Sequence, residues 1–319
     1  MASMTKYTSA GTRGCRIEAE LDGRLAIKTR DLTKRYGSGL VAVSALNLSV
    51  ARGEIYGFLG PNGAGKTTTI RMLLGLIEPT SGSVEVFGVS PGSRSGRERI
   101  GALVESPAFY PYLSGLDNLK GLASMAGVQR PQGRIDTVLK QVGLAGRGRD
   151  KFGKYSLGMK QRLGIAAALL KQPEIVVLDE PTNGLDPRGA AEMRSLIRSL
   201  GQEGRTVLLS SHLMGEVEEV CDRIGIIHHG TLVAEGTTDE LKGEGELLIR
   251  AEPLEQAARI AKELAGAVRV DGDMLWLSSD PGLSSEIAQR LISGGLRIIE
   301  MRQVQPSLEQ VFFRLTGEG

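Results

Sequence analysis

One short stretch restricts this chain more than any other feature: Gly60-Pro61-Asn62-Gly63-Ala64-Gly65-Lys66-Thr67-Thr68 matches the phosphate-binding pattern G-x-x-x-x-G-K-[ST]. The apolar run Ile55 to Leu59 precedes it, and Thr68 to Leu76 follows with helical spacing. Glycines let backbone N–H groups turn toward a polyphosphate, and a helix N-terminus attracts an anion. The stretch therefore predicts a nucleotide phosphate site between a strand and a helix. A glycine-rich turn without a ligand is the alternative, and the agreement of both flanks argues against it.

A second stretch supplies the acids that such a site needs. Glu174 to Glu180 reads as an apolar strand with two carboxylates at its C-terminal end, where open parallel α/β sheets carry their chemistry. We expect Lys66 to reach the β- and γ-phosphates, and Thr67 and Asp179 to hold Mg²⁺. Glu180 is suited to accept a proton from a water that attacks the γ-phosphate. A helix cap or a turn pair is the alternative interpretation of the two acids.

Other single residues leave two interpretations open. Tyr36, in a predicted turn, is either a core or turn tyrosine or an aromatic ring that stacks on a purine. His212 follows a strand predicted over Thr206 to Ser210, so it is either structural or a hydrogen-bond donor to the γ-phosphate. His228 and His229 are interpreted as ordinary sheet residues.

Composition excludes several classes of protein. The 319 residues include 41% hydrophobic residues, enough to fill the core of a large domain and a smaller one. Positive and negative charges nearly balance, with a formal net charge of +2, so the composition does not indicate a nucleic-acid-binding protein and no nucleic-acid partner is expected. The two cysteines, Cys15 and Cys221, form no disulfide framework or zinc pattern, which fits a reducing cytoplasm. No apolar run is long enough to span a bilayer, and Met1 to Ala10 lacks a secretory segment, so a membrane link is expected only through a partner.

The order of predicted elements divides the chain into three parts. Residues 1–23 are polar and aperiodic and predict a flexible arm. Residues 24–242 alternate strands and helices, with strands expected over Leu25 to Leu32 and Leu40 to Val50 and a loop over Ser90 to Gly96. Residues 243–319 read as β-α-β-β-α-β-α, which suggests a small ferredoxin-like module.

Two loops offer candidate contact surfaces. Glu105 to Tyr112 is a proline-punctuated loop with three aromatic residues, which either pack beneath the loop or dock another protein. The basic side chains between residues 147 and 154 are interpreted mainly as a solvated loop, with contact to a partner or anionic lipid as the alternative. Ser156 is then placed to cap a helix that runs through Leu170.

Taken together, these motifs resemble the ATP-binding subunit of an ABC transporter over roughly Leu25 to Lys242. The ordered set of motifs is more specific for this family than any single motif. It consists of an aromatic residue, the phosphate loop, a signature helix, the strand with two carboxylates, a Gly-Leu-Asp turn and a histidine. The resemblance implies an α/β P-loop NTPase core of the ABC type with a helical signature subdomain, beside the small C-terminal α+β module. It further implies ATP and Mg²⁺ as cofactors.

The resemblance also assigns roles to residues. It implies that Tyr36 stacks on adenine and that Gly60 to Thr68 holds the phosphates and Mg²⁺. At the matching positions, Asp179 is the metal-side carboxylate and Glu180 the catalytic base. Asp186 is the aspartate that couples the subunits, and His212 is the switch histidine. Ser156 and Gly158 match the signature motif, which in this family contacts ATP on the opposite subunit. A head-to-tail homodimer is therefore implied.

Two departures from the family pattern stand out. Glu105 replaces the usual glutamine; it still offers an oxygen to Mg²⁺ or to the attacking water, so it is a metal and catalytic candidate, but it adds negative charge beside the phosphates. The signature reads Tyr155-Ser156-Leu157-Gly158-Met159 instead of Leu-Ser-Gly-Gly-Gln. With Val104 to Tyr110, this signature looks like the subfamily that exports bacitracin and related antibiotic peptides.

The resemblance predicts an ATPase that drives a separately encoded integral membrane permease, from the cytoplasmic face of the cell membrane, in the export of an antibiotic, peptide or drug. A soluble ABC-type ATPase that acts on ribosomes or DNA is the alternative. Such relatives carry two cassettes or a long coiled coil, and this chain has one cassette and no sustained heptads. A regulatory or immunity protein with poor turnover is a third hypothesis, supported only by Glu105.

Overall fold

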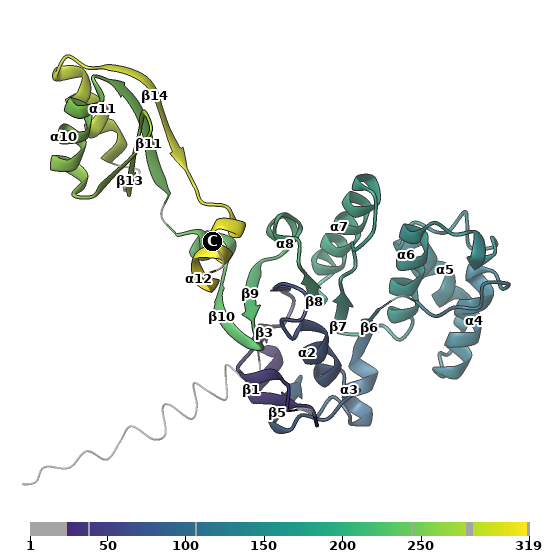
Figure 1. Cartoon of the computed structure of the whole chain (residues 1–319). Helices are drawn as coiled ribbons and strands as arrows, with labels where there is room; N and C mark the ends of the chain where they lie inside the picture. The colour runs from purple at the N-terminus through teal and green to yellow at the C-terminus, as the bar shows by residue number, and fades with distance from the viewer. Residues whose placement is uncertain (1–23, 38, 106, 244, 279–282, 318–319) are drawn as a thin grey trace, which may run out of the picture. The chain divides into compact units, whose positions relative to one another are not determined.

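The computed structural model describes residues 24–37, 39–105, 107–243, 245–278 and 283–317, and within them the chain forms two compact units (Figure 1). The first unit extends to Glu235 and the second begins at Gly236. This division precedes the boundary expected at 242/243, because helix α9 (Thr238–Lys242) packs against the C-terminal helix α12 (Leu308–Thr316). The arm predicted over residues 1–23 lies outside the described residues, as does Cys15.

The first unit is built on a six-stranded sheet in the order β10-β9-β4-β8-β7-β6. Its strands are β4 (Ile55–Leu59), β6 (Ile100–Leu103), β7 (Ile175–Asp179), β8 (Thr206–Ser211), β9 (Arg223–His228) and β10 (Thr231–Gly236). The pairs that join β6, β7, β8, β4 and β9 are all parallel. Strands β4, β7 and β8 are buried at every position, which explains why they read as continuous apolar runs.

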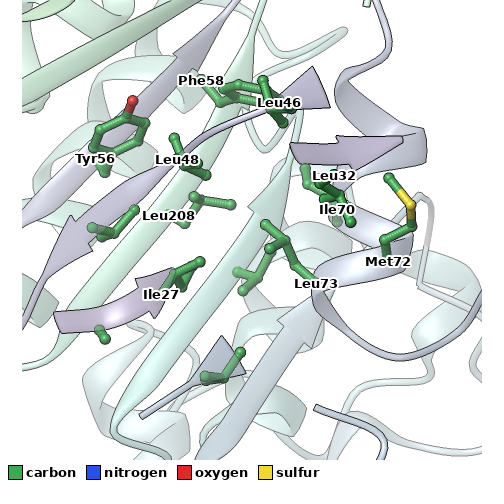
Figure 2. Packing of buried hydrophobic residues seen from close by; sticks show 14 of the residues in the cluster. Ile27, Leu32, Leu46, Leu48, Tyr56, Phe58, Ile70, Met72, Leu73 and Leu208 are labelled. Carbon is green, nitrogen blue, oxygen red and sulfur yellow. The ribbon is translucent and has the colours of Figure 1, made fainter. Parts of the chain in front are cut away.

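An antiparallel sheet covers part of this unit. Its strands are β1 (Leu25–Arg35), β2 (Val41–Leu46), β3 (Ser49–Ala51) and β5 (Ser81–Val86), with β1 paired to the other three. One hydrophobic core joins both sheets to helix α2 (Lys66–Leu73), and Figure 2 shows Ile27, Phe58 and Ile70 among its side chains.

The single strand expected over Leu40 to Val50 is wrong, because the chain breaks between β2 and β3. At the break the hydroxyl of Thr29 donates to the carbonyl of Leu46 and accepts from the N–H of Leu48, so a side chain from β1 replaces ladder bonds. The helix expected over Thr68 to Leu76 instead spans Lys66–Leu73: Gly65 is its N-cap residue, and the left-handed backbone of Gly75, with a φ of +66°, stops it after the C-cap Leu74.

Helices α4 (Gly115–Met125), α5 (Pro131–Gln141) and α6 (Leu157–Ala168) pack on one another, and Figure 1 shows them grouped beside β6. Ser156 caps α6 as expected, accepting from the N–H of Met159. The remaining helices in the described part of this unit are α3 (Arg94–Arg99), η1 (Phe152–Lys154), α7 (Pro187–Gln202) and α8 (Met214–Val220). Helix α3 corrects the expected loop over Ser90 to Gly96, since Ser93 caps a helix within it.

The second unit confirms the predicted β-α-β-β-α-β-α order. It contains β11 (Glu246–Glu252), α10 (Leu254–Ala265), β12 (Val268–Asp271), β13 (Met274–Ser278), α11 (Leu283–Ser293), β14 (Arg297–Val304) and α12. The sheet is antiparallel in the order β12-β13-β11-β14, and its core lies against α10 and α11. Within the described parts of both units, no helix is long and apolar enough to cross a membrane.

Candidate functional site

The phosphate loop lies between β4 and α2 and is packed too closely for side chains at two of its glycines. A Cβ on Gly60 would lie 2.4 Å from the carbonyl oxygen of Ile227. Gly65 has a φ of +106°, and a Cβ there would lie 2.5 Å from the carbonyl oxygen of Ala42. The backbone of the loop can therefore form only because these positions lack side chains.

Lys66 lies inside the loop with 5% of its surface exposed. Its Nζ donates to the carbonyl oxygens of Gly60, at 2.6 Å, and Pro61, at 3.2 Å. The same atom lies 3.1 Å from Oε1 of Glu180, so the residue that directly follows strand β7 supplies the counter-charge to the buried ammonium. Besides this ion pair, none of the described residues forms a hydrogen bond to Oε1, so the carboxylate oxygen can accept a proton once the Lys66 ammonium moves away.

A hydrogen-bond chain connects the loop to the ends of two parallel strands. The hydroxyl of Thr67 donates to Oδ2 of Asp179 at 2.9 Å. Ser210, fully buried, donates to Oδ1 of Asp179 and accepts from the N–H of Glu180 at 3.0 Å. Ser210 was not among the predicted site residues. The signal for it in the sequence is a small polar residue at the end of a second apolar strand, and the register of β7 and β8 pairs it with Asp179.

Asp179 and Thr67 together fit a magnesium ion. They place a carboxylate and a hydroxyl side by side, and Mg²⁺ in nucleotide sites takes one or two such oxygens together with phosphate and water oxygens. Among the described residues no group of three or more His, Cys, Asp or Glu side chains gathers as an all-protein cage.

Glu180 also contacts His212. Nδ1 of His212 lies 2.7 Å from Oε2 of Glu180, and because a carboxylate only accepts, Nδ1 carries the proton of this bond. Nε2 of His212 can then donate to a phosphate only as imidazolium, or after Nδ1 leaves Glu180. The backbone of Glu180 has a φ of 49°, a left-handed conformation that is uncommon outside glycine and turns the chain sharply at the end of β7.

A cavity of about 410 Å³ opens beside these groups. Its walls include the phosphate loop, Glu180 and the ring of Tyr36, which is 38% exposed. Nζ of Lys34 lies 5.5 Å from the centre of that ring. A planar base next to Tyr36 and a polyphosphate along the loop would both fit this cavity.

His229 also lines the cavity, so its interpretation as a sheet residue is wrong. It lies in the turn between β9 and β10 with a φ of 46°, and its ring centre is 4.0 Å from that of His228. The next residue, Gly230, donates its N–H to the carbonyl of Ala64 at 2.9 Å. A backbone bond thus ties this turn to the phosphate loop, a contact that no sequence pattern indicates.

Eight predicted site residues lie outside the cavity lining: Gly60, Ala64, Asp179 and His212, described above, and Glu105, Asp186, Ser156 and Gly158. Glu105, 63% exposed at its side chain, pairs with Arg71 of α2. Asp186 caps α7 by accepting from the N–H of Gly189 at 3.1 Å. Ser156 caps α6, and Gly158 follows in its first turn.

The signature turn and the Gly-Leu-Asp turn meet on one surface. A Cβ on Gly184 would lie 3.1 Å from a methyl of Leu157, and one on Gly158 would lie 3.7 Å from a methyl of Leu185. Leu157 is 42% exposed there. This surface, at the start of α6 and α7, presents an apolar side chain between two capped helix starts.

Comparisons with known proteins agree with this geometry. The family model described as ABC transporter matches residues 43–183. The bacitracin transport ATP-binding protein BcrA of Bacillus licheniformis is 44% identical over 302 residues, covering 92% of this chain and 98% of that protein. The daunorubicin resistance ATP-binding protein DrrA3 of Streptomyces coeruleorubidus is 39% identical, with coverage of 92% and 96%. A dimeric post-hydrolysis structure of the ATP-binding cassette MJ0796, bound to ADP and Pi, superposes with a TM-score of 0.60 at 26% identity, covering 66% of this chain and 98% of that one.

Proposed function

Because this chain belongs to the ABC transporter family, as an ATP-hydrolysing ATP-binding subunit, we propose that it drives a separate membrane permease that exports an antibiotic, peptide or drug. The observation that carries the proposal is the match to a bacitracin transport subunit over nearly its whole length, C-terminal unit included. The similarity to DrrA3, whose name refers to daunorubicin resistance, also supports the proposal that the exported compound is toxic.

ATP occupies the cavity beside the phosphate loop in this proposal. Adenine stacks on Tyr36, and the β- and γ-phosphates meet Lys66 and the N–H groups of the loop. The buried Lys66 ammonium then exchanges its contact with Glu180 for phosphate oxygens, which are stronger acceptors for it. Binding of ATP therefore releases the Glu180 carboxylate for catalysis.

Thr67 and Asp179 would hold Mg²⁺, which supplies charge neutralisation at the phosphates when bound. Ser210 holds Asp179 in position through its hydroxyl. Glu105 keeps a proposed place at the γ-phosphate side; its pair with Arg71 offsets the negative charge that distinguishes it from glutamine.

Hydrolysis uses Oε1 of Glu180, which Lys66 releases when the phosphates bind. A water oxygen attacks the γ-phosphorus, the bond to the bridging oxygen of ADP breaks, and Oε1 of Glu180 accepts the water proton. His212 orients Glu180 through Nδ1 and, once that bond is released, contacts the γ-phosphate.

Two subunits complete the site head to tail. The surface that carries Ser156, Gly158 and Asp186 would cover ATP bound to the opposite subunit, and the dimeric state of the MJ0796 cassette supports a dimer. Exposed Leu157 would be buried by closure.

The aromatic loop is our proposed contact with the permease. Phe109 packs edge-on against Phe152, with ring centres 5.1 Å apart, so it anchors the loop. Tyr110 and Tyr112, 60% and 65% exposed, lie together on its surface with ring centres 5.6 Å apart. Exposed tyrosines of this kind are typical of protein interfaces. Docking there would hold the subunit peripherally at the cytoplasmic face of the cell membrane.

Copurification tests the proposal. Tagged Glu180→Gln protein, which should hold ATP without turning it over, is expressed in its host, membranes are extracted gently with Mg²⁺-ATP, and captured proteins are identified. Lys66→Ala with the same tag is the matched control, since it loses the nucleotide. Recovery of a multi-span membrane protein with the first variant, and less with the second, supports the proposal. Recovery of ribosomal or DNA-bound proteins alone overturns it in favour of a soluble ATPase.

A further inference from the structure

The sheet of the C-terminal unit has two different faces. Its apolar face, which includes Leu247 and Ile249 of β11, packs against α10 and α11. Because side chains alternate along a strand, Leu248 belongs to the opposite face. There the register pairs it with Trp276 of β13, and Trp276 with Arg269 of β12. Trp276 is the single tryptophan of the chain and is only partly buried.

A cavity of about 350 Å³ lies against Trp276. Val304 and Pro306, at the end of β14 and just beyond it, give apolar walls, while Gln310 and Arg314 contribute from α12. The lower range of small-molecule sites begins near this volume, and such sites combine aromatic walls with a few convergent polar groups. This cavity has both.

Positive charge dominates the polar part of the cavity. The guanidinium of Arg269 lies 5.0 Å from the centre of the Trp276 ring, and its Nη2 is 3.8 Å from the carboxylate of Glu246, the one acid among the described residues that line the cavity. Arg314 forms no ion pair with a described residue and is exposed on α12. Gln310 uses its Oε1 to cap the helix at Ser307, which leaves its NH₂ group as a donor.

We propose that this cavity is a binding site for a small aromatic carboxylate. The ring of the ligand lies against Trp276 and the apolar wall, and its carboxylate accepts hydrogen bonds from Arg314, Arg269 and the Gln310 amide. The volume admits a ligand of about one amino acid, and two guanidinium groups against one carboxylate select an anion over a neutral analogue. The site is separate from the ATP cavity in every residue.

Tryptophan fluorescence measures ligand binding at this site directly. Excitation at the long-wavelength edge of the absorption band excites Trp276 and not the tyrosines. Full-length protein is titrated with N-acetyl-L-phenylalanine, and N-acetyl-L-phenylalanine amide serves as the matched neutral probe. We expect a saturable change of Trp276 emission with the acid and a weaker or absent response to the amide. Calorimetry with the same two probes measures binding independently of the fluorescence. No saturable emission change and no binding heat with the acid overturn the proposal, as does equal binding of the amide.

Variants separate the site from nonspecific effects. Arg314→Gln and Arg269→Gln should each weaken binding of the acid about tenfold, the typical loss for one charged hydrogen bond. Arg297→Gln is the control, because Arg297 lies exposed on β14 with Glu252 as partner and outside the cavity. Lys66→Ala should bind the acid normally, so failure of the ATP site and failure of this site are distinguishable. Equal affinity of all four variants overturns the proposal.

Discussion

Replacing Glu180 by Gln should separate three consequences of one carboxylate. In the structure this side chain accepts a hydrogen bond from His212 at 2.7 Å and balances the charge of Lys66 at 3.1 Å. The side chains of Lys66 and Glu180 are 5% and 20% exposed, so solvent screens the pair only in part. A charged hydrogen bond contributes about 1.5–3 kcal/mol. We therefore expect the free energy of unfolding, without nucleotide, to fall by about 2 kcal/mol.

Although the Glu180→Gln variant should be less stable, its affinity for Mg²⁺-ATP should increase. The variant lacks the carboxylate that competes with phosphate for the Lys66 ammonium and that repels the γ-phosphate. If the contact between the Lys66 ammonium and the phosphates becomes about 1.4 kcal/mol more favourable, Mg²⁺-ATP binds about tenfold more tightly. Hydrolysis should fall about 100- to 10,000-fold, the usual contribution of a general base.

Three assays measure these quantities: urea unfolding, calorimetric titration with Mg²⁺-ATP, and single-turnover hydrolysis of labelled ATP. Glu54→Gln is the matched control, since Glu54 pairs with Arg223 at 3.3 Å and lies outside the cavity. It should lose stability and keep hydrolysis. Wild-type hydrolysis by the Glu180 variant would refute its role as base, and weaker ATP binding would refute the competition between carboxylate and phosphate.

Four further predictions concern other parts of the first unit. Lys66→Ala should weaken Mg²⁺-ATP binding at least about tenfold by calorimetry, and unchanged affinity contradicts the phosphate-loop assignment. Ser210→Ala removes the hydroxyl that holds the metal-side carboxylate, so the Mg²⁺ concentration for half-maximal hydrolysis should rise about 10- to 100-fold, with Ser210→Thr closer to wild type. Gly57→Ala places a Cβ 2.3 Å from a valine methyl of α8 and 2.8 Å from the Cys221 sulfur, so urea unfolding should show a loss of about 1–3 kcal/mol. Burial raises the pKa of the Cys221 thiol, so little thiolate is present at pH 8 and a Cys15→Ser protein should react slowly with Ellman's reagent until it is denatured; fast labelling of the folded protein contradicts this.

The local sequence alone determined much of this protein. Glycines at positions 60 and 65 with Lys66 predicted the loop, since its backbone form depends on residues that are adjacent in the chain. The buried run before Asp179 predicted β7, because a strand covered on both faces must be apolar throughout. The β-α-β-β-α-β-α order of the last unit could be predicted because the spacing of apolar residues differs between its helices and its strands.

Tertiary structure decided which distant residues meet. Ser210 reaches Asp179 because β8 lies beside β7 in this register, and His229 lines the cavity at the phosphate loop because β9 lies beside β4, the strand that leads into the loop. Glu105, which the family resemblance predicts beside the phosphates, has a partner that no sequence pattern indicates: Arg71 of α2, whose guanidinium lies just beyond the end of β6. The Trp276 cavity likewise exists only where α12 returns to the end of the C-terminal sheet. Sequence patterns record the periodicity of each element, whereas the contacts between elements depend on strand order and side-chain packing, which no local pattern encodes.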